Sequence, residues 1–462
     1  MFSTLTIPTL ASLTLSEAEQ GLIKGLQMRS ESRGDMELTN AYYNGEQIFA
    51  NLRIAVPKEL EFLRTIVGWP AMAVDPYVER LQVDGFRRSD ATTGDQHIMD
   101  VLAENKFSAE QNLAFTDALA MKKAYWLVGS PTESGGAPVI TVESPLNMAV
   151  SWDGRGTTPT AALQEYIGVD GRKRGALVLP RQTVQLAADD RGNWEVVHRD
   201  QHDFDFVPIV RMANRVRSSN RDGRSEISNA LMALVDSACR TLLGLEVARE
   251  VYSTPQKVIL GALESAFVKA DGSAASALET YVTKVLALER DEQGNIPELH
   301  QWQVYDPSVF TKLVDMYAAQ ASGILAATPQ DLGLYTEGNP VSADAANASE
   351  ARRNRRADRM QREFGDPLVD VVKMALRFEN KGKLSEEYRR LVCDWEPVSR
   401  EALTSASDGV SKQVTAGSVP ATSDVVLKRL GYTEVERRQL DDDRRREDAR
   451  ASARAIAESV AR

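Results

Sequence analysis

The sequence predicts an α+β fold that is mainly helical. Short runs between residues 124 and 214 alternate apolar and polar residues and are separated by turn residues, which is typical of a mostly antiparallel sheet. Apolar residues at helical spacing dominate the chain before and after this block. With 462 residues, 43% hydrophobic and 26% charged, the chain is long enough for about two to four subdomains.

The region before the sheet is expected to be mostly helical. Apolar residues at helical spacing predict helices within 15–43, 60–79 and 95–123. Gly45 supplies a stop signal for the first of these, because glycine readily ends a helix in the left-handed conformation. A short strand is expected over 80–87, where the letters RLQVDGFR end at a turn.

Two helices bracket a small insert in the second half of the chain. A continuous apolar stripe begins near Ser225 and predicts a helix that ends before Pro255. A second helix is expected from Pro307 to Ala327. The residues between them mix short strands with a helix, so we expect a compact α/β insert whose two ends return to the same place.

A loop followed by a long helix is expected within 322–378. Gly333 and Pro340 interrupt regular structure, and Ser342 with Asp344 supplies a helix start signal because a hydroxyl caps free N–H groups and a carboxylate suits the helix dipole. Six arginines then crowd about three turns: Arg352, Arg353, Arg355, Arg356, Arg359 and Arg362. Their spacing alone is also typical of a solvated helix face, and that alternative stays open.

The chain beyond 378 is expected to be helical from Trp395 onward. Two apolar patterns lie within 402–416 and 423–430. The final segment alternates charge sign at helical spacing, which predicts a solvent-exposed helix.

Charge and composition exclude several classes of protein. The net charge of −11 argues against a protein that coats nucleic acid by neutralising phosphates, but it suits a conduit that does not trap DNA. Cys239 and Cys393 lie far apart in apolar contexts, as expected for free thiols in a reducing compartment. The N-terminus has no basic flank for a secretory signal. The most apolar helix contains Asp236 and Arg240, so no membrane span is expected.

The sequence contains no recognisable catalytic or cofactor motif. A GxxxxGK[ST] phosphate loop, a GxSxG elbow and an HExxH zinc motif are all missing. His198 and His202 are four residues apart but lie in an expected strand and loop without a nearby cysteine, so no metal, no cofactor and no enzymatic activity are expected. The carboxylates at 200, 203 and 205 leave one alternative open, which is a metal-dependent enzyme acting on nucleic acid.

An ordered set of segments carries a family resemblance. These segments are AYYNGEQ at 41–47, ERLQVDGFR at 79–87, VPIVRMANR at 207–215, DGRSEIS at 222–228 and TPQDLGLYTEGNPVSADAANASEARRNRRADRMQREFGDPL at 328–368. Together they resemble the portal proteins of tailed double-stranded-DNA bacteriophages, especially those of phages that infect actinobacteria. The resemblance covers most of the chain.

The resemblance implies a portal fold with seven successive parts. They are a wing over 1–224, a stem helix over 225–253, a clip over 254–306, a second stem helix over 307–327, a tunnel loop over 328–342, a long kinked helix with its connection over 343–394 and a helical crown over 395–462. Gly365 and Pro367 give the kink a cause, because proline removes a backbone donor and clashes with the preceding turn.

The resemblance also implies a function and a set of partners. Portal proteins form a homo-oligomeric ring, here expected to have twelve subunits, at one capsid vertex, and double-stranded DNA is packaged and ejected through it. The expected partners are the terminase large subunit, a head–tail adaptor protein, and the major capsid and scaffold proteins, with no membrane. The protein is then a virion component that occurs in the host cytoplasm during assembly. A minor capsid or scaffold protein without a channel is the remaining alternative.

The resemblance implies two sets of site residues. The channel-facing candidates are Gln330, Asp331, Tyr335, Thr336, Glu337 and Asn339. The candidates for subunit contacts or a band along the channel are Arg352, Arg355, Arg356, Arg359 and Arg362.

Overall fold

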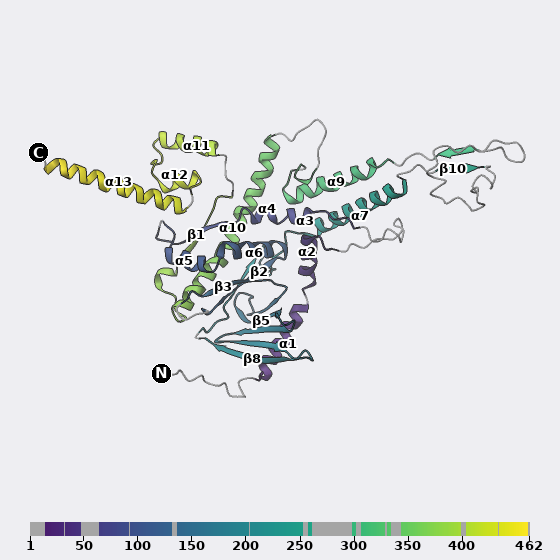
Figure 1. Cartoon of the computed structure of the whole chain (residues 1–462), viewed down its shortest axis with the longest axis horizontal. Helices are drawn as coiled ribbons and strands as arrows, with labels where there is room; N and C mark the ends of the chain where they lie inside the picture. The colour runs from purple at the N-terminus through teal and green to yellow at the C-terminus, as the bar shows by residue number, and fades with distance from the viewer. Residues whose placement is uncertain are drawn as a thin grey trace, which may run out of the picture. The chain divides into compact units, whose positions relative to one another are not determined.

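The chain folds into two compact units, which Figure 1 shows together. The first unit comprises residues 1–48, 68–232 and 322–462, and the second comprises 49–67 and 233–321. The structure, a computed structural model, describes residues 14–31, 33–47, 64–91, 93–131, 136–202, 204–252, 257–260, 298–301, 306–328, 330–333, 343–398, 403–432 and 434–460.

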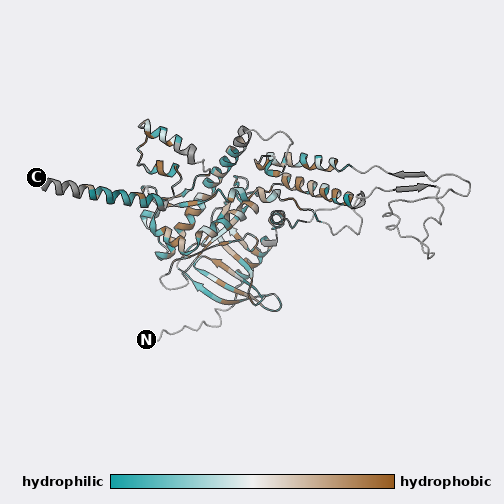
Figure 2. Ribbon diagram, turned by 45° about the horizontal axis from the view of Figure 1, so that its top comes forward, coloured by the Kyte–Doolittle hydropathy of each residue, from teal (hydrophilic) through white to brown (hydrophobic). Residues whose placement is uncertain are grey.

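A five-stranded antiparallel meander forms one part of the first unit. In spatial order its strands are β4 (Met148–Trp152), β5 (Pro159–Ile167), β6 (Lys173–Leu179), β7 (Gln182–Ala188) and β8 (Trp194–Gln201). In Figure 2 these strands carry both brown apolar and teal polar positions, as expected for a sheet whose side chains alternate between faces. The predicted antiparallel sheet is therefore confirmed.

Each face of this sheet has its own apolar core. Helix α1 (Glu17–Glu31) covers one face, where Ile23 and Leu26 pack with Leu163 and Val184. On the other face Val178 packs with side chains of the second sheet and its approach. The predicted helix pair is also confirmed, because α2 (Gly34–Asn44) follows α1 and ends at Gly45 with a left-handed φ of 70°.

A three-stranded sheet joins the helices to the meander. Its order is β3 (Val139–Glu143), β2 (Lys123–Gly129) and β9 (Ile209–Ala213), with both pairs antiparallel. The central strand β2 is almost wholly buried, and its Trp126 stacks on Phe107 with ring centroids 5.5 Å apart. Phe107 opens α6 (Phe107–Ala120), which packs on β2 and follows α5 (Gln96–Glu104).

Helix α10 (Ala343–Glu379) is the long helix that the sequence predicts. Its second half is part of the core of the first unit, where Phe364 is fully buried and stacks on Phe115 at 5.6 Å. Helical structure continues through Pro367 without a break. The kink predicted at Gly365 and Pro367 therefore falls inside one continuous helix, and it stays a prediction.

Two sequence-based predictions near the ends of this unit are wrong. The helix predicted within 60–79 is, in its described part, two short helices, α3 (Trp69–Met72) and α4 (Asp75–Val78), each with a proline in its first turn. The helical region predicted from Trp395 is preceded by a strand, β12 (Leu391–Trp395), which pairs antiparallel with β1 (Val83–Arg88).

The C-terminal helices belong to the first unit by contact. They are α11 (Leu403–Thr415), α12 (Asp424–Arg429) and α13 (Glu434–Val460). Arg437 anchors the start of α13, because its guanidinium binds Asp424 at 2.8 Å and Asp84 on β1 at 3.0 Å. Between residues 441 and 451 nearly every side chain of α13 is exposed, which confirms the predicted solvent-exposed helix.

The second unit contains most of two helices and a β-ladder. Helix α7 (Asn229–Tyr252) packs against α9 (Ser308–Leu325) through the Phe310 ring, whose edge lies 3.1 Å from the position a Cβ on Gly244 would take. Strand β10 (Lys257–Leu260) pairs antiparallel with β11 (Glu298–Gln301). The rest of the predicted insert lies outside the described residues. None of the described helices is long and apolar enough to span a membrane.

Candidate functional site

The predicted site begins where α9 ends within the first unit. Ala326 follows α9 with a left-handed φ of 54°, and the Ala327 N–H donates back to the Ser322 carbonyl at 3.1 Å. The last carbonyls of a helix have no partners inside the helix, so they need donors from elsewhere. This helix end is therefore a place where another element can be anchored.

Helix α10 supplies those donors from one face. Ser349, Arg353 and Arg356 are spaced by four and three residues and so lie on the same side of the helix. The Ser349 hydroxyl and Arg353 Nε both donate to the Ala326 carbonyl, at 2.9 and 3.0 Å. Arg356 donates to the Ile324 carbonyl at 3.0 Å. We call these three residues the α9 clamp, because they hold the first half of α10 to the end of α9.

Tyr77 completes the anchoring from α4. Its hydroxyl donates to the Leu325 carbonyl at 3.3 Å and accepts from Arg356 Nη1 at 3.4 Å. The Tyr77 side chain is only 2% exposed. A buried hydroxyl with both a donor role and an acceptor role fixes the orientation of its partners. Arg356, which was predicted to face a subunit or channel, is thus occupied within its own chain.

Asp331 is bound to the same helix. It lies in the short 3-10 helix η4 (Gln330–Leu332), and its carboxylate accepts from the Thr328 N–H at 2.8 Å and binds the Arg353 guanidinium. Partial burial alone would raise the pKa of Asp331, but the Thr328 hydrogen bond and the Arg353 charge outweigh it and leave that pKa below its ordinary value. The carboxylate is therefore ionised and largely neutralised by its own chain.

The remaining channel-facing candidates divide between described and undescribed residues. Gln330 is half-buried, and its side-chain oxygen has no hydrogen-bond partner in the described part of the chain. The candidates Tyr335, Thr336, Glu337 and Asn339 lie outside the described residues. Their placement toward a channel stays a prediction.

The predicted arginine band separates into two faces. Arg352, Arg355 and Arg362 are exposed, and Arg355 Nε donates only to the Ala351 carbonyl of its own helix. Arg359 lies between the faces, with Glu363 at 3.4 Å and Glu226 at 3.8 Å. We call Arg352, Arg355 and Arg362 the outer arginines, because they are free to meet a partner.

Arg353 is the residue that sequence reasoning omitted from its site candidates. It links η4, the end of α9 and α10 through a single guanidinium. Two signals could have identified it, which are its four-residue spacing from Ser349 and its position four residues before the fully buried Ala357.

The segment DGRSEIS at 222–228 explains its own residue types. Gly223 has φ of 81°, and a Cβ there would lie 2.5 Å from the Asn214 carbonyl oxygen and 2.7 Å from that of Lys122. Only glycine fits such a close backbone approach. Asp222 binds Lys123 at 2.8 Å, and burial lowers the pKa of that lysine although Asp222 opposes the shift.

Glu226 ties this segment to β9 and α10. Its side chain is 4% exposed and lies 2.8 Å from Arg215. Asn214 donates to it at 3.0 Å. The Arg215 N–H in turn donates to Glu363 on α10 at 3.2 Å. The segment therefore fixes the chain entering α7 against both the sheet and the long helix.

The histidine and carboxylate cluster does not assemble into a metal site in the described residues. His198 lies on β8 opposite Gln185, and His202 packs on the Phe204 ring at 5.3 Å. Asp203 lies outside the described residues. No group of three or more potential metal ligands forms within the part of the chain that is described.

Comparisons with known proteins bear on this arrangement. The family model described as "Phage portal protein, SPP1 Gp6-like" matches residues 26–444. The portal proteins of Mycobacterium phage D29 and Mycobacterium phage L5 are each 26% identical over 414 and 415 residues, which covers 88% of this chain and 84% of each relative. A similar solved structure, described as the neck of a native GTA particle computed with C12 symmetry, has a TM-score of 0.42 and 16% identity and covers 82% of this chain and 94% of its own.

Proposed function

We propose, from the premise that this chain belongs to the SPP1 Gp6-like family of phage portal proteins, that its copies form a homo-oligomeric ring through which double-stranded DNA enters and leaves a capsid. The observation that carries the proposal is the family match over 26–444, which includes every described element from α2 to the first part of α13. The chain is a portal protein with a structural and not an enzymatic role.

The described elements suit the parts of a portal subunit. We assign the wing to 1–224, the two stem helices to α7 and α9, the clip to the insert that holds β10 and β11, and the tunnel loop to 328–342. Helix α10 is then the long helix, and α11 to α13 form the crown. This assignment is supported by the order of the elements along the chain.

The α9 clamp gives the tunnel loop fixed ends. Arg353 holds Asp331 before the loop, and the same arginine with Ser349 holds α10 after it. A loop with both ends bound to one rigid helix can present its middle residues at a defined place. We propose that Tyr335, Thr336, Glu337 and Asn339 face the DNA. The acidic excess of the chain supports this, because a wall of low positive charge does not trap phosphates.

The outer arginines suit contacts between neighbouring subunits. Guanidinium groups bind carboxylates through two parallel hydrogen bonds, and a neighbouring copy of this acidic chain offers carboxylates. We propose that Arg352, Arg355 and Arg362 pair with acidic side chains of the next subunit. The expected ring has twelve subunits. Its partners are the terminase large subunit during packaging, a head–tail adaptor afterwards, and the major capsid and scaffold proteins around it.

Mass photometry of the purified full-length protein tests the ring. The expected species has close to twelve times the 50.9 kDa chain mass, and negative-stain images show a central hole. A protein that stays monomeric under all assembly conditions contradicts the proposal. Particles without a central channel favour a minor capsid or scaffold role instead.

A further inference from the structure

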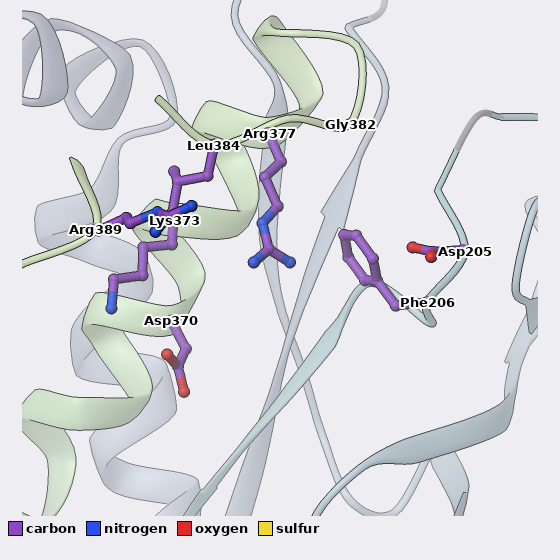
Figure 3. Close-up of a pocket in the computed structure, with 8 residues that line it drawn as sticks. All are labelled: Asp205, Phe206, Asp370, Lys373, Arg377, Gly382, Leu384 and Arg389. Carbon is purple, nitrogen blue, oxygen red and sulfur yellow. The ribbon is translucent and has the colours of Figure 1, made fainter. Parts of the chain in front are cut away.

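An open groove runs along the second half of α10. Its larger part is a pocket of about 630 Å³ between α10 and the loop after β8 (Figure 3). A smaller hollow of about 360 Å³ adjoins it toward the β4–β5 turn. The two share the lining residues Phe206, Asp370, Lys373 and Arg377, so they form one continuous feature that we call the α10 groove.

One end of the groove is cationic. Lys373, Arg377 and Arg389 line the larger pocket together with Asp205 and Asp370. Figure 3 shows the Arg377 guanidinium pointing into the space between α10 and Phe206, over whose ring it lies at 5.3 Å. Among the described residues neither Lys373 nor Arg377 makes an ion pair, whereas Arg356 and Arg353 are both bound within the chain. These two cations are therefore available to an incoming carboxylate.

The other end of the groove is largely apolar. Trp152, Pro367 and Met374 line the smaller hollow, and Arg211 covers one side of the Trp152 ring at 4.1 Å. A cleft that places cations beside apolar walls suits a peptide segment carrying an acidic side chain next to an apolar one.

The groove continues the face of α10 that carries most of the outer arginines. Residues three or four apart share a helix face, and one such series runs from the arginine band into the groove. Its members are Arg355, Arg359, Arg362, Asp366, Asp370, Lys373 and Arg377. The series spans about 33 Å at 1.5 Å per residue. The groove is thus the far end of a surface proposed for subunit contact.

We propose that the α10 groove of one subunit receives an acidic, apolar-flanked segment of a second copy of this chain. The inference rests on the proposed ring. In a closed ring each subunit meets the next through two different surfaces, so a groove on one copy needs a complementary segment elsewhere on the other. With 66 acidic against 55 basic residues, a neighbouring copy is a suitable source of carboxylates for Lys373 and Arg377.

Photo-crosslinking inside assembled particles identifies the occupant. The full-length protein carries p-benzoylphenylalanine in place of Phe206 or, in a second variant that leaves the loop intact, in place of Leu384, which also lines the pocket. Particles are purified as rings, illuminated and digested for mass spectrometry. We expect crosslinks from both positions to one acidic segment of a different copy, distinguished from contacts within one chain by mixing isotope-labelled and unlabelled subunits.

Charge reversal tests the chemistry of the contact. The double variant Lys373→Glu with Arg377→Glu is expected to lower the inter-chain crosslink yield at least about tenfold, because two charge-assisted bonds become repulsive. The matched control is Lys381→Glu with Lys383→Glu, which has the same charge change at exposed positions just beyond the helix. The control is expected to retain the crosslink.

Several results overturn the inference. Rings that form normally but give no inter-chain crosslink, or crosslinks only within one chain or to a different protein, contradict it while leaving the ring itself in place. An equal loss of crosslink in the Lys381 and Lys383 control shows a general charge effect and also contradicts it. Wild-type protein that forms no ring removes the proposed function and this inference together.

Discussion

The two faces of α10 use the same residue type for different purposes. On the inner face Arg353 and Arg356 bind backbone carbonyls and Asp331 of their own chain. On the outer face Arg352, Arg355 and Arg362 are exposed. The difference teaches that an arginine-rich helix is not one binding surface. Substitutions on the inner face should therefore change the stability of a single subunit, and those on the outer face should change assembly.

The largest effect on single-subunit stability is expected in the buried second half of the inner face. Phe364→Ala removes a fully buried ring that stacks on Phe115. The loss of burial and the cavity left behind should lower the free energy of unfolding by about 3–5 kcal/mol. Urea denaturation of the subunit measures it. A change as small as that of the exposed control Arg362→Ala would show that this face is not core.

Reversal of the outer arginines should produce the largest effect on assembly. Arg352→Glu, Arg355→Glu and Arg362→Glu together are expected to raise the concentration needed for ring formation at least about tenfold, because salt bridges to the next subunit become repulsive. The monomer should keep its stability to within about 0.5 kcal/mol per site. Mass photometry over a dilution series measures the shift.

A matched variant distinguishes a specific contact from a general charge effect. Arg445→Glu, Arg446→Glu and Arg450→Glu make the same charge change on the exposed part of α13. Assembly of the outer-arginine variant at wild-type concentrations would return those arginines to the alternative of a solvated face.

A smaller loss of subunit stability is expected from the α9 clamp. Arg353→Ala leaves the Ala326 carbonyl with one donor instead of two and leaves Asp331 without its cation. We expect a loss of about 1–3 kcal/mol in the free energy of unfolding, against about 0.5 kcal/mol or less for the neighbouring Arg352→Ala. Thermal or urea denaturation of both variants compares the faces directly. Equal losses would contradict the distinction.

The smallest effect should appear in the pH dependence of stability. The folded pKa of Asp331 lies below its ordinary value of 3.8. Its contribution to stability is therefore complete above pH 3.8 and is lost as the pH falls through the lower folded pKa. Unfolding of Asp331→Asn and the wild type at pH 7 and pH 3 measures this. The difference between the two proteins should shrink at the lower pH, and a constant difference would show that the carboxylate charge is not what stabilises η4.

Local patterns in the sequence were sufficient for most of the fold. The alternation of β2 to β9 and the glycine stop at Gly45 depend on neighbouring residues, so they can be read from the sequence. Strand β12 could not be predicted in this way, because its partner β1 lies about 300 residues earlier in the chain. A five-residue run is ambiguous without the strand that it pairs with.

The site was predicted in position but not in detail. Spacing located the arginine helix, yet it gave no reason to separate Arg353 and Arg356 from Arg352 and Arg355. That separation depends on where the α9 carbonyls end, which is a tertiary fact. In the same way, α7 begins at Asn229 and not near Ser225, because the Ser225 hydroxyl donates to the Ala120 carbonyl at 2.6 Å instead of starting the helix. Lys373 and Arg377 were missed because no pattern marks a groove.

An end-on cryo-electron microscopy reconstruction of the purified full-length protein tests the central claim most directly. The account predicts a closed ring with a central channel, with the segment after Asp331 at the channel wall and the outer arginines of α10 against the next subunit. A monomer, a particle without a channel, or a ring in which the outer arginines face only solvent would contradict it.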